Sequence, residues 1–147
     1  MNATTVVTGA NRGIGLATAQ LLADQGHEVV GTGRTAPENF PGTFYEVDFA
    51  DSANLAAIGA GIAERHAVTS LVNNAGLSQA RSIETVTMED MDAHYQVNLR
   101  ALVQLTQIMD RQYRQPGRRR PRRAHALCGD QGGIGRADAK LGPGPGP

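Results

Sequence analysis

A glycine-rich turn stands between a β-branched segment and an apolar helical repeat at the start of the chain. Residues 4–8 read Thr-Thr-Val-Val-Thr, and residues 9–15 contain the three glycines Gly9, Gly13 and Gly15. Apolar residues then recur at helical spacing: Ile14, Ala17, Leu21 and Leu22. Because glycine has no Cβ, such a turn bends sharply and lets backbone N–H groups approach a ligand. This arrangement indicates a dinucleotide phosphate site at the helix N-terminus, with a ligand-free turn as the alternative.

Strand and helix patterns alternate through the first 110 residues. The strand patterns cover residues 4–8, 27–33, 43–48 and 68–73. Asp51 can cap a helix after the third strand, and Thr87 and Asp90 resemble a capping box before a longer helix. The apolar stripe of that longer helix includes one polar residue: Met91, Tyr95, Asn98, Leu102, Leu105 and Met109. The alternation predicts an α/β fold with a parallel sheet and right-handed crossovers.

Charge and composition divide the chain near residue 110. Residues 1–110 hold five basic and twelve acidic residues, net −7, whereas residues 111–147 hold nine basic and two acidic residues, net +7. The second part also contains eight glycines and five prolines but few aliphatic residues. We therefore expect residues 1–112 to form a dinucleotide-binding portion and residues 113–147 to be a disordered tail or the product of a shifted reading frame.

Cysteine content and hydropathy of the whole chain limit the cell compartments in which we expect the protein. Cys128 is the single cysteine, which excludes an internal disulfide and a cysteine-rich metal site. No stretch approaches the ~20 apolar residues that span a bilayer, and the N-terminus does not resemble a secretory signal. These features predict a cytoplasmic protein with no membrane partner and no metal site.

Four motifs between about residue 4 and residue 110 carry a family resemblance. They are Thr8-Gly9-x-x-x-Gly13-x-Gly15, Asp48 after the third strand, Asn73-Asn74-Ala75-Gly76 after the fourth strand, and Asn98 in the long helix. Together they resemble the short-chain dehydrogenase/reductase family. The resemblance implies a Rossmann-like doubly wound parallel sheet, truncated after the helix that contains Asn98. It also implies hydride transfer between NADP(H) and a small carbonyl or alcohol substrate.

The same resemblance assigns roles to residues. It implies cofactor contacts at Thr8, Gly9, Asn11, Arg12, Gly13, Ile14, Gly15, Arg34, Asp48, Phe49, Asn74, Ala75 and Gly76. The Asp48 carboxylate is expected to accept from the adenine amino group, and Asn73 and Asn74 to hold neighbouring strand ends in register. Asn98 is expected to act in catalysis by ordering a water. Without the resemblance, Asn98 is typical of a core amide bonded to a backbone group, and Asp48 of a turn.

Two arginines favour NADP over NAD. NAD sites of this type carry an acidic residue about 20 positions after the glycine motif, where it accepts from the ribose 2′-OH. Gly33-Arg34 stands at that place here, and Arg12 lies inside the glycine turn. A fixed cation suits a 2′-phosphate. The alternative is that both arginines are solvated surface residues.

The catalytic set that the resemblance implies is incomplete. Family members use a serine together with a tyrosine and a lysine four residues later, which lowers the pKa of the phenol. Lys140 is the single lysine, and Arg136 stands four residues before it. Residues 118–123 read Arg-Arg-Arg-Pro-Arg-Arg, which excludes the buried strand that should carry the serine. The chain is therefore expected to be inactive as a reductase.

Our hypothesis for this loss is a shift of reading frame between about residues 111 and 120. One base downstream, the degenerate codons of residues 127–142 permit Tyr-Ala-Ala-Thr-Lys, which resembles the missing segment. Two functions remain: an NADP-dependent reductase that is catalytically incomplete, or a non-catalytic NADP(H)-binding module. We expect no nucleic-acid contact, because no aromatic residue interleaves the arginines. A family-type homo-oligomer is in doubt, since its second helix follows the missing lysine.

Overall fold

The structure of the protein is a computed structural model that describes residues 3–113. The tail predicted for residues 113–147 lies outside the described part, except for Tyr113 at the end of the last helix. Lys140, Cys128 and the arginine run at 118–123 also lie outside it, as does most of the stretch in which we place the frame change.

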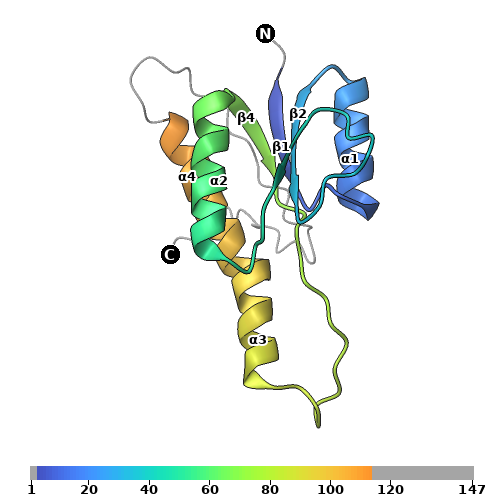
Figure 1. Cartoon of the computed structure of the whole chain (residues 1–147), viewed down its shortest axis with the longest axis vertical. Coiled ribbons are helices and arrows are strands. Elements are labelled where there is room, and N and C mark those ends of the chain that lie inside the picture. The colour runs from blue at the N-terminus through green and yellow to red at the C-terminus, as the bar shows by residue number, and fades with distance from the viewer. Residues whose placement is uncertain (1–2, 114–147) are drawn as a thin grey trace, which may run out of the picture.

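Four parallel strands form one sheet, as the alternation of patterns predicts (Figure 1). They are β1 (Thr4–Thr8), β2 (Glu28–Gly33), β3 (Thr43–Glu46) and β4 (Val68–Val72), in the order β3-β2-β1-β4. Every residue of β1 is buried, which is typical of a strand covered on both faces. The third strand ends two residues earlier than predicted, and Asp48 instead forms a turn in which Oδ1 accepts from Ala50 N at 2.9 Å.

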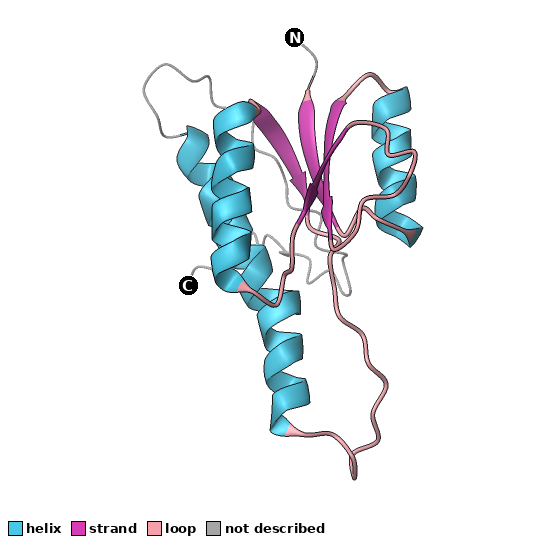
Figure 2. Ribbon diagram, in the orientation of Figure 1, coloured by secondary structure: helices cyan, strands magenta, loops and turns pink. Residues whose placement is uncertain are grey.

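Helices cover both faces of the sheet in a doubly wound, Rossmann-like arrangement (Figure 2). α1 (Gly13–Asp24) lies over the smaller cluster of buried residues: Val7, Ala10, Ala19 and Val29. α2 (Ser52–Arg65) and α4 (Ala101–Tyr113) lie on the other face. They cover the larger cluster: Val6, Val30, Val47, Phe49, Leu55, Ile62, Val68, Ala101, Leu105 and Met109.

The apolar residues that mark α1 in the sequence do not all face the core. Gly15 and Ala19 are the buried residues of α1, whereas Ile14 and Leu21 are 79% and 57% exposed. The cause is the close approach of the helix to the glycine turn, because a Cβ on Gly15 would lie 2.3 Å from the carbonyl oxygen of Gly9. Small residues four positions apart share one helix face, and this face packs against the sheet.

Both predicted helix caps are present. Asp51 precedes α2, and its Oδ1 accepts from the N–H groups of Ala53 and Asn54, each at 2.9 Å. Thr87 and Asp90 form the reciprocal capping box of the long helix. Thr87 Oγ1 accepts from Asp90 N at 3.1 Å, and Asp90 Oδ2 accepts from Thr87 N at 3.2 Å. Local capping chemistry therefore fixes where these two helices begin.

The long helix is not one regular α-helix, as its spacing predicts, but three segments. A π-helical turn, η1 (Gln96–Arg100), separates α3 (Met88–Tyr95) from α4. Met91 and Tyr95, expected on the apolar stripe, are 54% and 55% exposed. The reason is that α3 extends past the sheet and past α2, so that among residues 3–113 none of its side chains is buried (Figure 1). The π-helical turn, which contains Asn98, lies where the helix leaves the sheet.

Candidate functional site

The glycine turn lies at the carboxyl end of β1 and leads directly into α1 (Figure 1). Gly9 and Gly13 have φ angles of 64° and 55°, in the left-handed region that glycine adopts without a Cβ clash. The first N–H groups of a helix lack partners within it, and this end of the dipole is positive. No acidic residue stands in the first turn of α1. A Cβ on Gly13 would meet no heavy atom within 4 Å, so the turn has open space for an anion.

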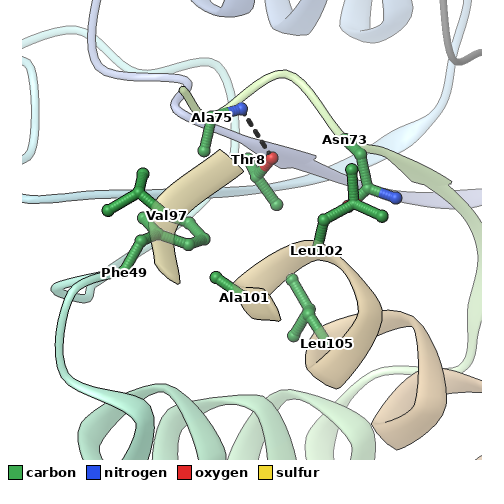
Figure 3. A pocket seen from close by; sticks show the side chains of 8 residues that line it. All are labelled: Thr8, Phe49, Asn73, Ala75, Val97, Ala101, Leu102 and Leu105. Atoms are coloured by element: carbon green, nitrogen blue, oxygen red, sulfur yellow. Dashed lines mark hydrogen bonds between the residues drawn. The ribbon is translucent and has the colours of Figure 1, made fainter. Parts of the chain in front are cut away.

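Thr8 and Asn74 fix this turn against the end of β4. Thr8 Oγ1 accepts from the N–H groups of Asn74 and Ala75, each at 2.9 Å. Figure 3 shows the bond to Ala75. Asn74 Nδ2 donates in return to the carbonyl oxygens of Thr8, at 3.0 Å, and Gly9, at 3.2 Å. Thr8 is buried and its two bonding partners are half-buried, so water has limited access to these bonds. Four residues predicted for the site therefore lie together: Thr8, Gly9, Asn74 and Ala75. Asn74 joins the ends of β1 and β4, as expected.

Asn73 has a different role from the one expected. Its Nδ2 donates to Thr106 Oγ1 of α4 at 3.3 Å, so it ties the sheet to the covering helix rather than to a neighbouring strand end. Successive side chains at a strand end point to opposite faces, and Asn74 already faces the glycine turn. Thr106 is a partner that helical spacing did not reveal.

A mainly apolar pocket lies between Thr8 and the long helix (Figure 3). It is lined by Thr8, Phe49, Asn73, Ala75, Val97, Ala101, Leu102 and Leu105. Phe49, which follows β3, and Val97, from η1, stand at the same end of it in Figure 3. The pocket brings together residues from the ends of β1, β3 and β4, which the sequence separates widely.

Asp48 is exposed next to this pocket wall. Its Oδ1 accepts from Ala50 N at 2.9 Å, and its own N–H donates to Asn54 Oδ1 at 3.1 Å. Asp48 therefore has the turn geometry that its position indicates without the family resemblance. Within residues 3–113, its Oδ2 makes no hydrogen bond, so an exposed acceptor remains for a ligand amino group.

Asn98 binds the backbone of the segment that follows β4. Its Oδ1 accepts from Leu77 N at 2.6 Å, and its Nδ2 donates to Leu77 O at 2.9 Å. An amide bonded to a backbone group is what the helix pattern alone predicts for Asn98. Asn98 is, however, exposed rather than part of the core. Leu77 is not among the predicted site residues. Its side chain carried no signal because the contact is made through its main chain.

Arg12 and Arg34 are both exposed, and neither guanidinium forms an ion pair within residues 3–113. Arg12 is the N-cap residue of α1, and its side chain makes no capping bond. Arg34 follows β2, whose last residue lies against the glycine turn, because a Cβ on Gly33 would stand 3.1 Å from Asn11 Oδ1. Two cations that have no ion-pair partner within residues 3–113 therefore follow segments that lie at the turn.

Glu28 stands at the first residue of β2, whereas the glycine turn follows the carboxyl end of β1. Hydrogen bonds from His66 and Thr4 hold the pKa of Glu28, at the opposite end of β2, below its ordinary value. No group of three or more His, Cys, Asp or Glu side chains in residues 3–113 is placed to hold a metal ion. Across the same residues, no helix has the length and apolar character needed to cross a bilayer.

Known proteins resemble this chain over the same region. A sequence profile of the short chain dehydrogenase family matches residues 3–118. L-xylulose reductase of Homo sapiens is 35% identical over 112 residues, which cover 72% of this chain and 45% of that protein. An NADPH-dependent 3-dehydrocapnine reductase of Ornithobacterium rhinotracheale is 34% identical over 114 residues, covering 69% and 40%. The chain thus spans less than half the length of these relatives.

Solved structures share the fold. The ligand-free aldohexose dehydrogenase of Thermoplasma acidophilum matches with a TM-score of 0.71 and 26% identity, over 78% of this chain and 46% of that one. A Beutenbergia cavernae structure with NADP bound at low occupancy matches with a TM-score of 0.69 and 30% identity, over 76% and 49%. Sequence and structure agree over most of the described residues, and the chain belongs to the short chain dehydrogenase family.

Proposed function

We propose that this chain is the cofactor-binding part of an NAD(P)-dependent oxidoreductase and that it binds NADP(H). The observation that carries the proposal is the paired contact of Thr8 and Asn74, which holds the glycine turn in place at the N-terminus of α1. Free N–H groups, a helix dipole and open space over Gly13 suit a dinucleotide pyrophosphate. The absence of an acidic residue in the first turn of α1 favours the same ligand.

The proposed contacts follow the order of the chain. The glycine turn and the start of α1 bind the phosphates: Thr8, Gly9, Asn11, Arg12, Gly13, Ile14 and Gly15. The segment after β3 binds adenine through the free Oδ2 of Asp48 and the main chain of Phe49. The segment after β4 lies beside the ribose: Asn74, Ala75 and Gly76. The exposed fraction of Ile14, 79%, is consistent with a side chain that packs on a ligand.

NADP is the proposed cofactor rather than NAD. Arg34 stands where NAD-binding sites of this type carry a carboxylate, and both Arg12 and Arg34 lack ion-pair partners within residues 3–113. A guanidinium binds a phosphate through charge-assisted, bidentate hydrogen bonds. The NADPH-dependent relative and the related structure with bound NADP support this choice.

We propose that this chain binds the cofactor without turnover. In the whole protein, the bound nicotinamide exchanges a hydride with a small carbonyl or alcohol substrate. A tyrosine paired with a lysine four residues later exchanges the proton in the family, and the 147 residues contain no such pair. Asn98, which Leu77 holds at the edge of the site, is the remaining candidate for a catalytic group.

Titration of the purified chain with NADPH and NADH tests the proposal. We expect NADPH fluorescence to change on binding, with tighter binding for NADPH than for NADH. A second step adds L-xylulose as a test carbonyl and follows NADPH absorbance. Binding without NADPH oxidation supports the proposal. Absence of NADPH binding contradicts the cofactor assignment, and oxidation of NADPH contradicts the assignment of an inactive chain.

The environment and partners remain proposals of the same kind. We propose a cytoplasmic protein with no nucleic-acid or membrane partner, in which the family-type homo-oligomer does not form. Four exposed apolar side chains of the long helix recur every four residues and would support self-association without fixed stoichiometry: Met91, Tyr95, Leu99 and Val103.

A further inference from the structure

The π-helical turn η1 directs three consecutive side chains to three parts of the candidate site. Gln96 Nε2 donates to the carbonyl oxygen of Phe49 at 3.3 Å. Val97 lines the apolar pocket, together with the side chain of Phe49 (Figure 3). Asn98 holds both backbone polar groups of Leu77. One short turn therefore connects the segment after β3 to the segment after β4.

Gln96 is the first of three glutamines spaced eight residues apart on the long helix. Gln104 Nε2 donates to Ser52 O at 2.7 Å, and Gln112 Nε2 donates to Ala63 O at 2.7 Å. These partners stand at the two ends of α2, which lies beside α4 and runs in the same direction (Figure 1). The other two glutamines therefore secure α4 on α2, whereas the bond of Gln96 reaches the segment before α2.

We infer that Gln96 is a positioning residue for cofactor binding. The choice of NADP(H) as the ligand rests on the proposed function. In that proposal, Asp48 and Phe49 contact adenine, and Gly76, next to Leu77, lies beside the ribose. The bond from Gln96 to Phe49 O and the bonds from Asn98 to Leu77 start from the same turn of helix. Gln96 thereby fixes the distance between the segment after β3 and the segment after β4, and the adenosine part of the cofactor binds between these two segments.

Gln104 provides a matched control. It has the same side chain, lies on the same helix and donates to a main-chain carbonyl, but Ser52 lies inside α2 and lines no part of the candidate site. If Gln96 acted merely by securing the helix, replacing either glutamine would have the same effect on the site. Methionine is the replacement for both, because it preserves the unbranched shape and helix propensity but lacks the N–H donor.

Amide hydrogen exchange of Leu77 measures the positioning without any ligand. The Leu77 N–H is bonded to Asn98 Oδ1, so its exchange rate reports how firmly η1 holds the segment after β4. In the full 147-residue chain, we expect Gln96→Met to raise this rate by about 2- to 10-fold, the range that loss of one hydrogen bond gives. Gln104→Met should leave the rate at its wild-type value.

Binding of 2′,5′-ADP, measured by calorimetry, tests the consequence for the cofactor site. We expect Gln96→Met to weaken this binding by about 2- to 10-fold and Gln104→Met to leave it unchanged. Gln96→Lys restores a donor long enough to reach Phe49 O and should recover both readouts, whereas Gln96→Glu, which cannot donate there, should not. The comparison of lysine with glutamate decides the matter even if the methionine variant fails to fold.

The outcomes separate the two proposals. Equal effects of Gln96→Met and Gln104→Met on Leu77 exchange, or no effect of either, overturn the positioning role. Equal Leu77 exchange rates in Gln96→Lys and Gln96→Glu would overturn the positioning role as well, because only the lysine can donate to Phe49 O. If the wild-type chain does not bind 2′,5′-ADP but Leu77 exchange responds to Gln96 alone, the proposed cofactor function is wrong, while the role of Gln96 in positioning the segment after β4 stands.

Discussion

Replacing Thr8 by valine tests how far the candidate site depends on one hydroxyl group. Valine keeps the shape of the side chain and its preference for a strand, and it removes the oxygen atom. That oxygen accepts from Asn74 N and Ala75 N, each at 2.9 Å, and donates to Val72 O at 3.3 Å. The substitution therefore leaves two backbone N–H groups at the end of β4 without their partner.

The structure sets the expected size of the effect. A buried donor left without a partner costs about 1–3 kcal/mol, so two such donors cost about 2–6 kcal/mol. Because Asn74 and Ala75 are half-buried, water replaces part of the loss, and we expect the lower half of that range. A loss of about 2–4 kcal/mol is large beside the total stability of about 5–15 kcal/mol that is common for single domains.

Urea unfolding followed by circular dichroism measures this loss. With an m-value of about 2 kcal/mol/M, the midpoint should fall by about 1–2 M in Thr8→Val. Thr5→Val is the control, because Thr5 is equally buried in the same strand but makes a single side-chain bond, to His27 Nδ1 at 2.9 Å. It should lose about 1 kcal/mol. Equal midpoint shifts for the two variants would refute the special role of the Thr8 hydroxyl.

Three further predictions concern the cofactor, the glycine turn and pH. Arg34→Ala should weaken NADPH binding by about 10-fold or more and leave NADH binding unchanged, because it removes one charge-assisted contact with the 2′-phosphate; calorimetry with both cofactors measures this. Gly15→Ala should abolish NADPH binding and lower the melting temperature, since its Cβ would stand 2.3 Å from Gly9 O; wild-type behaviour would contradict the close packing. The pKa of Glu28 is lowered chiefly by its bond to His66, so this interaction stabilises the fold above the unfolded-state pKa and is lost as pH falls through the lowered value. Urea titrations between pH 2 and pH 6 should show that the free energy of unfolding depends less on pH in His66→Ala than in the wild type. Identical pH profiles of the two proteins would contradict this role of the Glu28–His66 bond.

The order of strands and helices could be predicted because local signals agree with the tertiary fold. The β-branched residues of β1, the glycine turn and the caps at Asp51 and Thr87 each act over a few residues and appear in the structure as expected. Local consistency of this kind is what makes a sequence pattern informative. The meeting of Thr8 with Asn74 also follows from the parallel sheet, since both stand at carboxyl ends of neighbouring strands.

The remaining features depend on contacts between distant segments. The π-helical turn leaves no pattern in apolar spacing, so the exposure of Tyr95 could not be predicted from it. Ile14 fits the helical repeat of α1, yet the close approach of Gly15 to the glycine turn places it in solvent. Bonds to main-chain groups, such as those of Asn98 to Leu77 and of Gln96 to Phe49, carry no signal at the partner residue because its side chain takes no part.

Amide chemical shifts of the labelled chain, recorded during titration with NADPH, test most directly that the glycine turn binds the cofactor phosphates. The largest changes are predicted for the N–H groups of Gly13, Ile14 and Gly15 at the start of α1, followed by that of Arg34. Repeating the titration with NADH should preserve the changes at α1 and reduce the change at Arg34. Saturating NADPH that leaves the three α1 amides unshifted, or that shifts amides at the opposite end of the sheet instead, would contradict the assignment.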